Sequence, residues 1–280
     1  RGSSVIAGEL FALGVRSGSH VALCGSNSVN WILTFFAIQR IGAVAVLLNP
    51  QLSPEEITGF SKLGDITHFC LGKTPFRDRK HFSKQVLDQE GSQITAILDV
   101  GDEHDFLKDP VTSYPDVDVT QDDPCVIIFT SGSTATPKCV QLSSFYLLNS
   151  SNYCVHNLNM TTDDKECAIL PLYHIFGLTA VLFPCLICGS LMILPHSTKP
   201  GDLMHLLKDE QCTILHAVPT FLIRLVNAPG FSPQYVSSIR VSYMSGAPIS
   251  KAQLKILMDR FPNNLFIRRY GLTEMEPIIA

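Results

Sequence analysis

Short apolar runs and amphipathic stretches alternate along nearly the whole chain. Runs rich in Val, Ile and Leu predict buried strands, because a strand covered on both faces reads as a continuous apolar segment. We expect strands at residues 21–24, 43–48, 67–71, 94–100, 125–129, 139–142, 168–170, 191–194, 213–217, 239–243 and 265–269. Helical patterns lie between most of them, at 29–40, from 54 onward, and at 81–89, 219–226 and 251–260. This rhythm predicts an α/β fold in which helices flank mainly parallel β-sheets.

The helix that starts near Pro54 carries the clearest start signal. Ser53 can cap it, Pro54 suits the first helical position because that position needs no N–H donor, and Glu56 can complete a capping box. We therefore expect this helix to begin at Pro54.

Two polar stretches interrupt the apolar pattern. Residues 101–124 are rich in turn formers and acidic residues, and strand signals resume directly after them, so we expect an excursion over the surface. Residues 157–162 separate a helical run from the next strand and form the better boundary. We therefore predict two packed α/β subdomains, 1–157 and 158–280.

The segment 178–194 is apolar enough to suggest a membrane span. Pro184, Gly189 and Ser190 interrupt it, whereas about 20 unbroken apolar residues are needed to cross a bilayer. We expect instead a buried helix, a tight turn and a buried strand.

Composition and charge narrow the class of protein. Of the 280 residues, 46% are hydrophobic and 16% are charged, which supplies enough apolar material for a large globular core. The formal net charge is -4, and the sequence has no long run of Lys or Arg. A nucleic-acid partner is therefore not expected.

The nine cysteines are scattered singly, apart from Cys185 and Cys188, which form a CxxC pair. No second Cys or His pair has zinc-ligand spacing, and no redox-motif context precedes this pair, so we expect two buried helical thiols. The odd count favours thiols in a reducing, intracellular compartment.

The segment 125–143, CVIIFTSGSTATPKCVQLS, carries the most informative chemistry. A predicted strand enters a loop of small and hydroxyl residues, which Lys138 closes before the next strand. Small residues let backbone N–H groups approach phosphate oxygens, hydroxyls can donate hydrogen bonds, and Lys138 supplies a positive charge. The loop comprises Thr130, Ser131, Gly132, Ser133 and Thr134. We predict a phosphate-binding loop, with a flexible hairpin as the alternative.

This loop is not a Walker A motif, because it lacks that motif's second glycine and following helix. It resembles the signature loop (S/T)SG(S/T)TGxPKG of the adenylate-forming superfamily, in particular the acyl-CoA synthetase, coumarate-CoA ligase and luciferase type. The match covers residues 130–134 and 137–138. The resemblance implies a loop that grips the β- and γ-phosphates of ATP, and a fold like the large N-terminal domain of that family.

A second match, YGLTE at residues 270–274, corresponds to the family's YGxTE. The resemblance implies that Tyr270 stacks on adenine with Gly271 beside it. Thr273 would hydrogen-bond the α-phosphate, and Glu274 would hold the Mg²⁺ that bridges phosphates.

Two shorter matches lie between these motifs. PLYHIFG at residues 171–177 resembles P(L/M)(F/Y)HxxG, and the family places its histidine, here His174, beside the acyl carboxylate. The other match resembles SG(G/A)AP, which lies along the adenine and acyl pocket, and consists of Ser245, Gly246, Ala247 and Pro248. The four motifs follow the family's order, and the resemblance extends from about Val5 onward.

Four substitutions depart from the family's pattern. Ala135 and Cys139 stand where the family has glycine, and alanine at a position that needs a positive φ costs about 1 kcal/mol. Arg269 replaces a glycine before the tyrosine, and Glu276 replaces a small residue that shapes the acyl pocket. These changes bear on ATP turnover and on the choice of acid.

The resemblance implies an ATP-dependent acid–thiol ligase that forms an acyl-adenylate and then transfers the acyl group to CoA. Its expected catalytic residues are Lys138, Thr273, Glu274 and His174. An apolar helix at 219–223 favours a fatty or aromatic acid, as in fatty acid or phenylpropanoid metabolism.

The partners implied are the carboxylic acid, ATP with Mg²⁺, and CoA, in the cytoplasm or a peroxisome. The family's C-terminal lid domain would lie beyond residue 280, so we expect this chain alone to be inactive in thioester formation.

Two other interpretations stay open. An amino-acid adenylation domain would carry an acidic residue early in the substrate helix, where residues 219–223 are apolar. A catalytically degenerate nucleotide-binding homologue would keep the fold without the chemistry. The substitutions at Ala135, Cys139, Arg269 and Glu276 favour the degenerate homologue.

Overall fold

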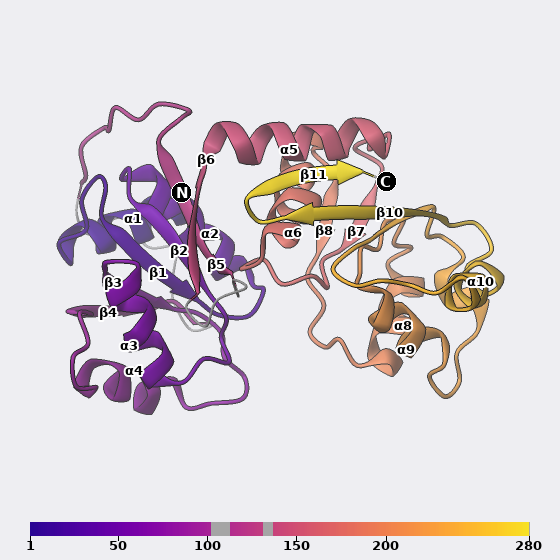
Figure 1. The fold of residues 1–280 in the computed structure, drawn as a ribbon, viewed down its shortest axis with the longest axis horizontal. Coiled ribbons are helices and arrows are strands. Elements are labelled where there is room, and N and C mark those ends of the chain that lie inside the picture. Colours follow the sequence, from indigo (N-terminus) through magenta and orange to yellow (C-terminus); the bar gives the residue numbers. More distant parts are fainter. Residues whose placement is uncertain (102–112, 131–136, 280) are drawn as a thin grey trace. The chain divides into compact units, whose positions relative to one another are not determined.

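The computed structural model describes residues 1–101, 113–130 and 137–279, the last four of them as backbone only. Its internal contacts divide the chain into two compact units, Arg1–Tyr146 and Leu147–Ala280. Both units combine parallel strands with helices (Figure 1), which confirms the α/β fold expected from the alternating pattern.

The first unit is built around one sheet. Its elements are α1 (Gly2–Ala12), β1 (His20–Cys24), α2 (Val29–Arg40), β2 (Val44–Leu48), α3 (Pro54–Leu63), β3 (Ile66–Leu71), α4 (Arg79–Asp88), β4 (Ala96–Asp99), β5 (Pro124–Thr130) and β6 (Lys138–Ser143). Among the described residues the strand order is β4-β3-β1-β2-β5-β6, parallel except for β6, which pairs antiparallel with β5. β2 is buried at every position, which explains its unbroken apolar sequence.

Side-chain caps fix the starts of helices in this unit, among them α2 and α3. The Ser28 hydroxyl accepts a hydrogen bond of 3.1 Å from the N–H of Trp31 at the start of α2. In α3 the Ser53 hydroxyl accepts from the N–H of Glu56 at 3.2 Å, and the Glu56 carboxylate accepts from the N–H of Ser53 at 2.8 Å. The expected capping box is therefore confirmed, and each such bond satisfies a donor that the helix itself leaves unpaired.

The second unit continues from α5 (Ser144–Asn157), which crosses the division between the units. The division lies before residue 147, whereas the polar stretch expected to mark a boundary begins at residue 157. The remaining elements are β7 (Lys165–Cys167), α6 (Ile175–Gly177), the π-helix η1 (Leu178–Leu182), α7 (Phe183–Cys188), β8 (Leu191–Ile193), α8 (Pro200–Asp209), α9 (Pro219–Val226), the 3₁₀ helix η2 (Pro233–Val236), β9 (Val241–Met244), α10 (Lys251–Arg260), β10 (Leu265–Leu272) and β11 (Met275–Ile279).

The strands of the second unit form two ladders joined by single bridges. β7 pairs with β8, and β10 lies between β9 and β11. Figure 1 shows β10 and β11 as yellow arrows near the C-terminus. Ile214 bridges Glu166 on one side and Val241 on the other. The expected strand at 213–217 is thus reduced to isolated bridges, and the expected strand at 168–170 is wrong. The strand there is β7, which the apolar pattern missed because Lys165 and Glu166 are charged.

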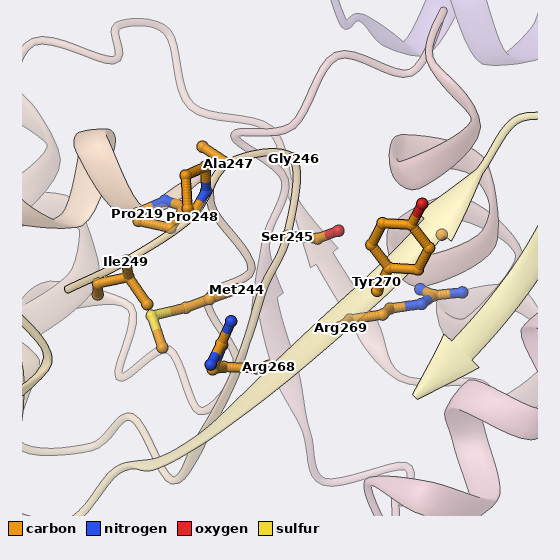
Figure 2. A pocket seen from close by; sticks show the side chains of 11 residues that line it. Pro219, Met244, Ser245, Gly246, Ala247, Pro248, Ile249, Arg268, Arg269 and Tyr270 are labelled. Atoms are coloured by element: carbon orange, nitrogen blue, oxygen red, sulfur yellow. The ribbon is translucent and has the colours of Figure 1, made fainter. Parts of the chain in front are cut away.

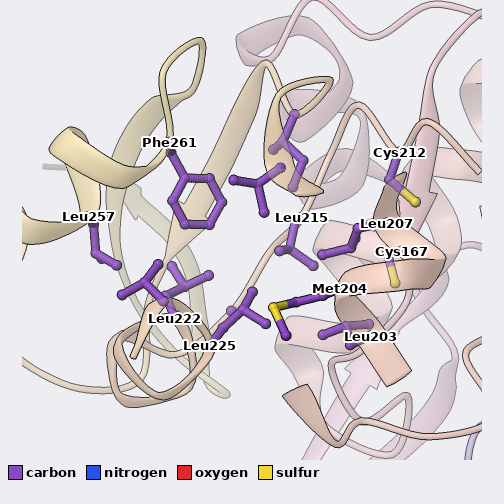
Figure 3. Packing of buried hydrophobic residues seen from close by; sticks show 14 of the residues in the cluster. Cys167, Leu203, Met204, Leu207, Cys212, Leu215, Leu222, Leu225, Leu257 and Phe261 are labelled. Carbon is purple, nitrogen blue, oxygen red and sulfur yellow. The ribbon is translucent and has the colours of Figure 1, made fainter. Parts of the chain in front are cut away.

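The core of the second unit lies between α8, α9 and α10. Figure 3 shows leucines of α8 and α9 directed toward Leu215 and Phe261, with Leu257 of α10 completing the cluster. These side chains are almost completely buried. Their packing holds the N-terminus of α9 and the end of β9, the two places from which the site described below is built.

The apolar segment 178–194 folds as a bent helix followed by a short strand. η1 and α7 form the helix, and Gly189 ends it with a φ of 76°, a left-handed conformation that suits glycine. β8 is not the buried strand that the sequence predicted, since Leu191 is 51% exposed. No helix in the described ranges combines the length and apolar character needed to cross a membrane.

All nine cysteines lie in the described part of the chain and are thiols rather than disulfides. Cys185 and Cys188 are both on α7, as expected, but only Cys185 is buried; Cys188 is partly exposed. The expectation of two buried helical thiols therefore holds for one of the pair.

Candidate functional site

The predicted phosphate loop connects the two strands of a hairpin. Thr130 at the end of β5 lies directly opposite Lys138 at the start of β6. Thr130 is partly buried and Lys138 is exposed, so the lysine ammonium is open to a ligand. The rest of the loop lies outside the described residues: Ser131, Gly132, Ser133, Thr134 and the substituted Ala135.

The YGLTE motif forms the end of β10 and the turn that follows it. The sequence predicted a strand ending at Arg269, but β10 continues through Tyr270 to Leu272 because β11 pairs with it. Thr273 and Glu274 make the turn; the threonine is buried and the glutamate exposed. The Tyr270 ring is 56% exposed and available for stacking.

Two of the predicted motifs line one cavity within the second unit. Its volume is about 430 Å³, and its lining comes from the start of α9, the segment after β9 and the end of β10 (Figure 2). The cavity therefore brings together six of the predicted site residues: Ser245, Gly246, Ala247, Pro248, Tyr270 and Gly271.

Gly246 has a structural reason to be glycine. Its φ is 81°, in the left-handed region that side chains disfavour, and a Cβ there would lie 3.3 Å from Cγ1 of Val218. This conformation turns the chain after β9 so that the SGAP segment lines the cavity.

The PLYHIFG motif, which contains His174, ends in the short helix α6. The exposed His174 is the N-cap of α6, and its Nδ1 accepts a hydrogen bond of 3.2 Å from the N–H of Phe176. A Cβ at Gly177 would lie 2.1 Å from the carbonyl oxygen of Pro171, so only glycine allows this close approach. His174 is not among the residues that line the cavity.

A buried acid–base pair, which the sequence reading did not single out, lies behind the cavity wall. Nε2 of His216 is 3.6 Å from Oε1 of Glu166, and both side chains are completely buried. Burial lowers the pKa of His216 to about 3, and the charge of Arg269 adds to this. Burial also raises the pKa of Glu166 well above its usual value, so burial favours the neutral form of both groups. A single histidine inside the apolar run 214–218 was the signal in the sequence for this pair.

Contacts on every side fix the orientation of this pair. Nδ1 of His216 accepts a hydrogen bond of 2.9 Å from the N–H of Tyr243, which assigns the ring proton to Nε2. The ring stacks on Tyr243 and Phe176, at centroid distances of 5.0 and 6.4 Å. The Cys185 thiol donates to Oε2 of Glu166 at 3.4 Å.

Arg269 completes the layer between this pair and the cavity. It lines the cavity and is only 5% exposed. Its guanidinium carbon lies 5.4 Å from the ring centroid of Tyr243 and 5.7 Å from that of Phe176. In the sequence, Arg269 stood out as a departure from the family pattern, but nothing there indicated that Tyr243 and Phe176 pack against it.

An ion pair fastens β7 to β9 at the far end of the sheet. Arg240 donates to both carboxylate oxygens of Asp164, at 2.8 and 2.7 Å, and to the carbonyl of Leu158 at 2.9 Å. Although burial alone would raise it, hydrogen bonds from Arg240 and Thr213 keep the pKa of Asp164 below its usual value. This clamp fixes the start of β9, whose other end leads into the SGAP segment.

The family model described as AMP-binding enzyme matches residues 3–280 of the chain. The chain belongs to the AMP-binding enzyme family. It is 29% identical to the acyl-CoA ligase sidI of Aspergillus fumigatus over 97% of this chain and 50% of that protein. It is 28% identical to 4-coumarate–CoA ligase 2 of Oryza sativa subsp. japonica over 98% of this chain and 51% of that protein. The chain thus spans about half the length of the curated relatives it matches.

Solved structures support the fold of this AMP-binding family member. The crystal structure of ATP-bound MatB from Rhodopseudomonas palustris matches with a TM-score of 0.84 at 24% identity. The match covers 99% of this chain and 54% of that one. At this identity the match establishes the arrangement of the backbone and assigns no role to individual side chains.

The side chains described at these motifs can offer two kinds of contact to a ligand. The exposed ring of Tyr270 offers a stacking surface, and the exposed Lys138 offers a positive charge. Among the described residues, no group of three or more His, Cys, Asp and Glu side chains could hold a metal ion. The exposed Glu274 nevertheless fits Mg²⁺, because that ion is commonly held by one or two carboxylates together with substrate phosphates.

Proposed function

We propose that this chain is the nucleotide- and acid-binding part of an ATP-dependent acid–thiol ligase of the acyl-CoA synthetase type. The observation that carries the proposal is the cavity lined jointly by the SGAP and YG motifs, in a chain whose family match spans nearly all its residues. A pocket lined by apolar residues and a few polar groups is the usual form of a small-molecule site.

In the proposed first step a carboxylate oxygen attacks the α-phosphorus of ATP and pyrophosphate leaves. Two anions must approach each other, so the protein contributes by positioning them and neutralising charge. Tyr270 would stack on adenine, and Lys138 and the phosphate loop would meet the phosphates. Thr273 would donate to the α-phosphate, and His174 would orient the carboxylate of the acid.

The proposed metal is Mg²⁺, which Glu274 would hold and which would supply positive charge against the phosphates. The phosphate loop is in the first unit and YGLTE is in the second, so the proposal requires both motifs to reach the same nucleotide.

The proposed second step transfers the acyl group to CoA, with a fatty or aromatic acid as substrate. The name of the rice relative, a 4-coumarate–CoA ligase, supports an acid of this kind. The start of α9 is apolar, whereas an amino-acid adenylation domain would need a carboxylate there for the substrate's ammonium group. We place such an enzyme in the cytoplasm or a peroxisome.

We further propose that the 280-residue chain binds nucleotide without completing thioester formation. The chain covers half of its acyl-CoA ligase relatives. A purified 280-residue protein should release no acyl-CoA from ATP, CoA and a panel of acids. Acyl-CoA formation by this protein at a normal rate would contradict the proposal that it binds nucleotide without forming the thioester.

The activity itself is tested by acid-dependent exchange of labelled pyrophosphate into ATP, measured on this chain and on any longer protein that contains it. We expect pyrophosphate exchange with carboxylic acids. The Lys138→Ala variant should lose it, and the Lys80→Ala variant, which changes a lysine outside the proposed site, should keep it. Exchange with amino acids only would identify an adenylation domain. No exchange with any acid would identify a degenerate homologue and overturn the proposal.

A further inference from the structure

The cavity that the SGAP and YG motifs line also carries an exposed positive charge. Arg268 and Tyr270 of β10 both line the cavity and are exposed, whereas Arg269 between them is buried. Successive residues of a strand point to opposite faces, so Arg268 and Tyr270 share the outer face of β10. Figure 2 shows the side chains of Arg268 and Arg269 leaving β10 in different directions. The Arg268 guanidinium thus belongs to the same face as the ring proposed to stack on the base.

The two neighbouring arginines differ in their partners. Arg269 packs against the rings of Tyr243 and Phe176. In the part of the chain that the structure describes, the side chain of Arg268 has no hydrogen-bond, ion-pair or ring partner. An arginine presents five N–H donors, has no acceptor and stays charged at any pH at which the protein is folded. Arg268 can therefore offer all its donors to a ligand in the cavity.

The spacing of Arg268 and Tyr270 suits contacts with one base. Positions i and i+2 of a strand lie about 7 Å apart on the same face, so a base stacked on the tyrosine ring has its edge within reach of the long arginine side chain. No Asp or Glu is among the described residues that line the cavity, so no carboxylate of this lining competes for the guanidinium. We therefore expect Arg268 to meet the edge of the base.

One edge of a purine distinguishes guanine from adenine. Guanine presents two acceptors there, O6 and N7, and hypoxanthine presents the same two, whereas adenine presents N7 and an amino group that donates. A guanidinium can donate to O6 and N7 together, which is the commonest specific contact of arginine with guanine in DNA. It cannot accept a hydrogen bond from the amino group of adenine. An arginine at this edge therefore favours a base with an oxo group.

We propose that Arg268 reads this edge of the base, and that the site consequently accepts 6-oxopurine nucleotides, those of guanine and hypoxanthine, at least as readily as adenine nucleotides. This inference rests on the proposed function, which stacks a purine on Tyr270. It widens the class of nucleotide that the site takes and names the residue that sets the choice.

The test compares the affinities of the 280-residue protein for AMP, inosine monophosphate (IMP) and guanosine monophosphate (GMP) by calorimetric titration. AMP and IMP share the ribose and the phosphate and differ at the edge of the base, where IMP has an oxo group in place of the amino group. The ratio of their affinities therefore reports on that edge. We expect IMP and GMP to bind at least as tightly as AMP, and weaker binding of both than of AMP would overturn the proposal.

Substitutions locate the choice of base. Arg268→Gln offers one donor and one acceptor, the pairing that suits adenine, so the affinity for IMP relative to AMP should fall about tenfold. Arg268→Lys keeps a charged donor without the planar fork and should give an intermediate ratio. Arg260→Gln removes an exposed arginine of α10 outside the cavity and should leave the ratio unchanged. A ratio that survives Arg268→Gln, or that falls equally in Arg260→Gln, contradicts a role for Arg268.

Pyrophosphate exchange separates this inference from the function on which it rests. With a carboxylic acid present, we expect exchange into the triphosphates of adenosine and inosine alike. Exchange into ATP alone, with a ratio of IMP to AMP affinity that ignores Arg268→Gln, would leave the ligase function standing and overturn the reading of the base. An affinity ratio that depends on Arg268, without exchange into any nucleotide, would overturn the ligase function and leave the reading of the base intact.

Discussion

His216 and Glu166 show how burial sets the charge of single residues in this protein. Each would be partly or fully ionised in water at neutral pH, yet both are completely buried 3.6 Å apart. The lowered pKa of His216 and the raised pKa of Glu166 both favour the neutral form of the pair. Burying a neutral pair avoids most of the free energy needed to bury an ion pair. The cost appears instead as a dependence of stability on pH.

The buried His216 should by itself make stability fall in mildly acidic solution, whereas the raised pKa of Glu166 acts in the opposite direction. The pKa of His216 is about 3 in the folded protein, against an ordinary value of 6.5. Between these values the unfolded chain binds a proton that the folded protein does not, so folding free energy is lost as pH falls, by up to about 1.4 kcal/mol per pH unit. Denaturant melts from pH 7 to 4 should show a reduced slope for His216→Gln. The exposed His156 provides the control, and an equal change of slope on His156→Gln would contradict this assignment.

Glycine is required at position 177 for a steric reason. A Cβ there would meet the carbonyl oxygen of Pro171 at 2.1 Å, a backbone atom that cannot turn aside. Gly177→Ala should cost about 2 kcal/mol or more of unfolding free energy, because the PLYHIFG segment has to shift.

Gly59 on α3 is the matched control for that substitution. It is exposed, and nothing lies within 4 Å of its ideal Cβ. Gly59→Ala should be neutral or stabilise the protein by up to about 1 kcal/mol, because alanine favours the helix. Equal effects of the two substitutions in chemical denaturation would contradict the steric argument.

At the scale of elements, local signals predicted helices better than short strands. The periodic pattern placed α2, α9 and α10 at their observed bounds, and the capping box placed the start of α3. β7 was missed because two of its three residues are charged and are accommodated only by tertiary contacts. A pattern of apolar residues along the sequence cannot reveal a strand whose charged residues are stabilised by partners far away in the chain.

The candidate site was predicted in the same uneven way. The motifs contain six of the residues that line the cavity, since SGAP and YG are each contiguous in sequence. The layer behind them joins Glu166, His216 and Arg269 from three separate segments. That layer depends on strand pairing between residues far apart in the chain, which no local pattern encodes.

The clamp between Asp164 and Arg240 is an element-scale prediction. It joins β7 to the start of β9 through two short hydrogen bonds, and the Asp164 side chain is only 4% exposed. Asp164→Asn should lower the free energy of unfolding by about 2 kcal/mol, because it leaves a partly buried guanidinium without its counter-charge.

The surface ion pair Lys255–Asp259 is the control against which the loss of stability in Asp164→Asn is compared. Its side chains are 76% and 60% exposed, at positions i and i+4 of α10. Asp259→Asn should cost less than about 0.5 kcal/mol. Comparable losses for the two variants in denaturant titrations would show that the clamp contributes no more than a surface ion pair.

At the scale of the whole molecule, the two units supply different parts of the proposed chemistry. The first unit provides the strands that flank the phosphate loop, and the second provides the cavity with the SGAP and YG motifs. The chain spans about half the length of its curated relatives, so the proposed binding is the part of the chemistry that can be tested on it directly.

The most direct test of the central claim is the affinity of the 280-residue protein for AMP, with and without Tyr270→Ala. Stacking of a base on an aromatic ring contributes about 1–3 kcal/mol, so we expect the substitution to weaken AMP binding by about tenfold or more. Tyr153→Ala, which removes a similarly exposed tyrosine from α5, should leave the affinity unchanged. Absence of AMP binding, or equal affinities for the wild-type and Tyr270→Ala proteins, would contradict the assignment of this cavity to the nucleotide.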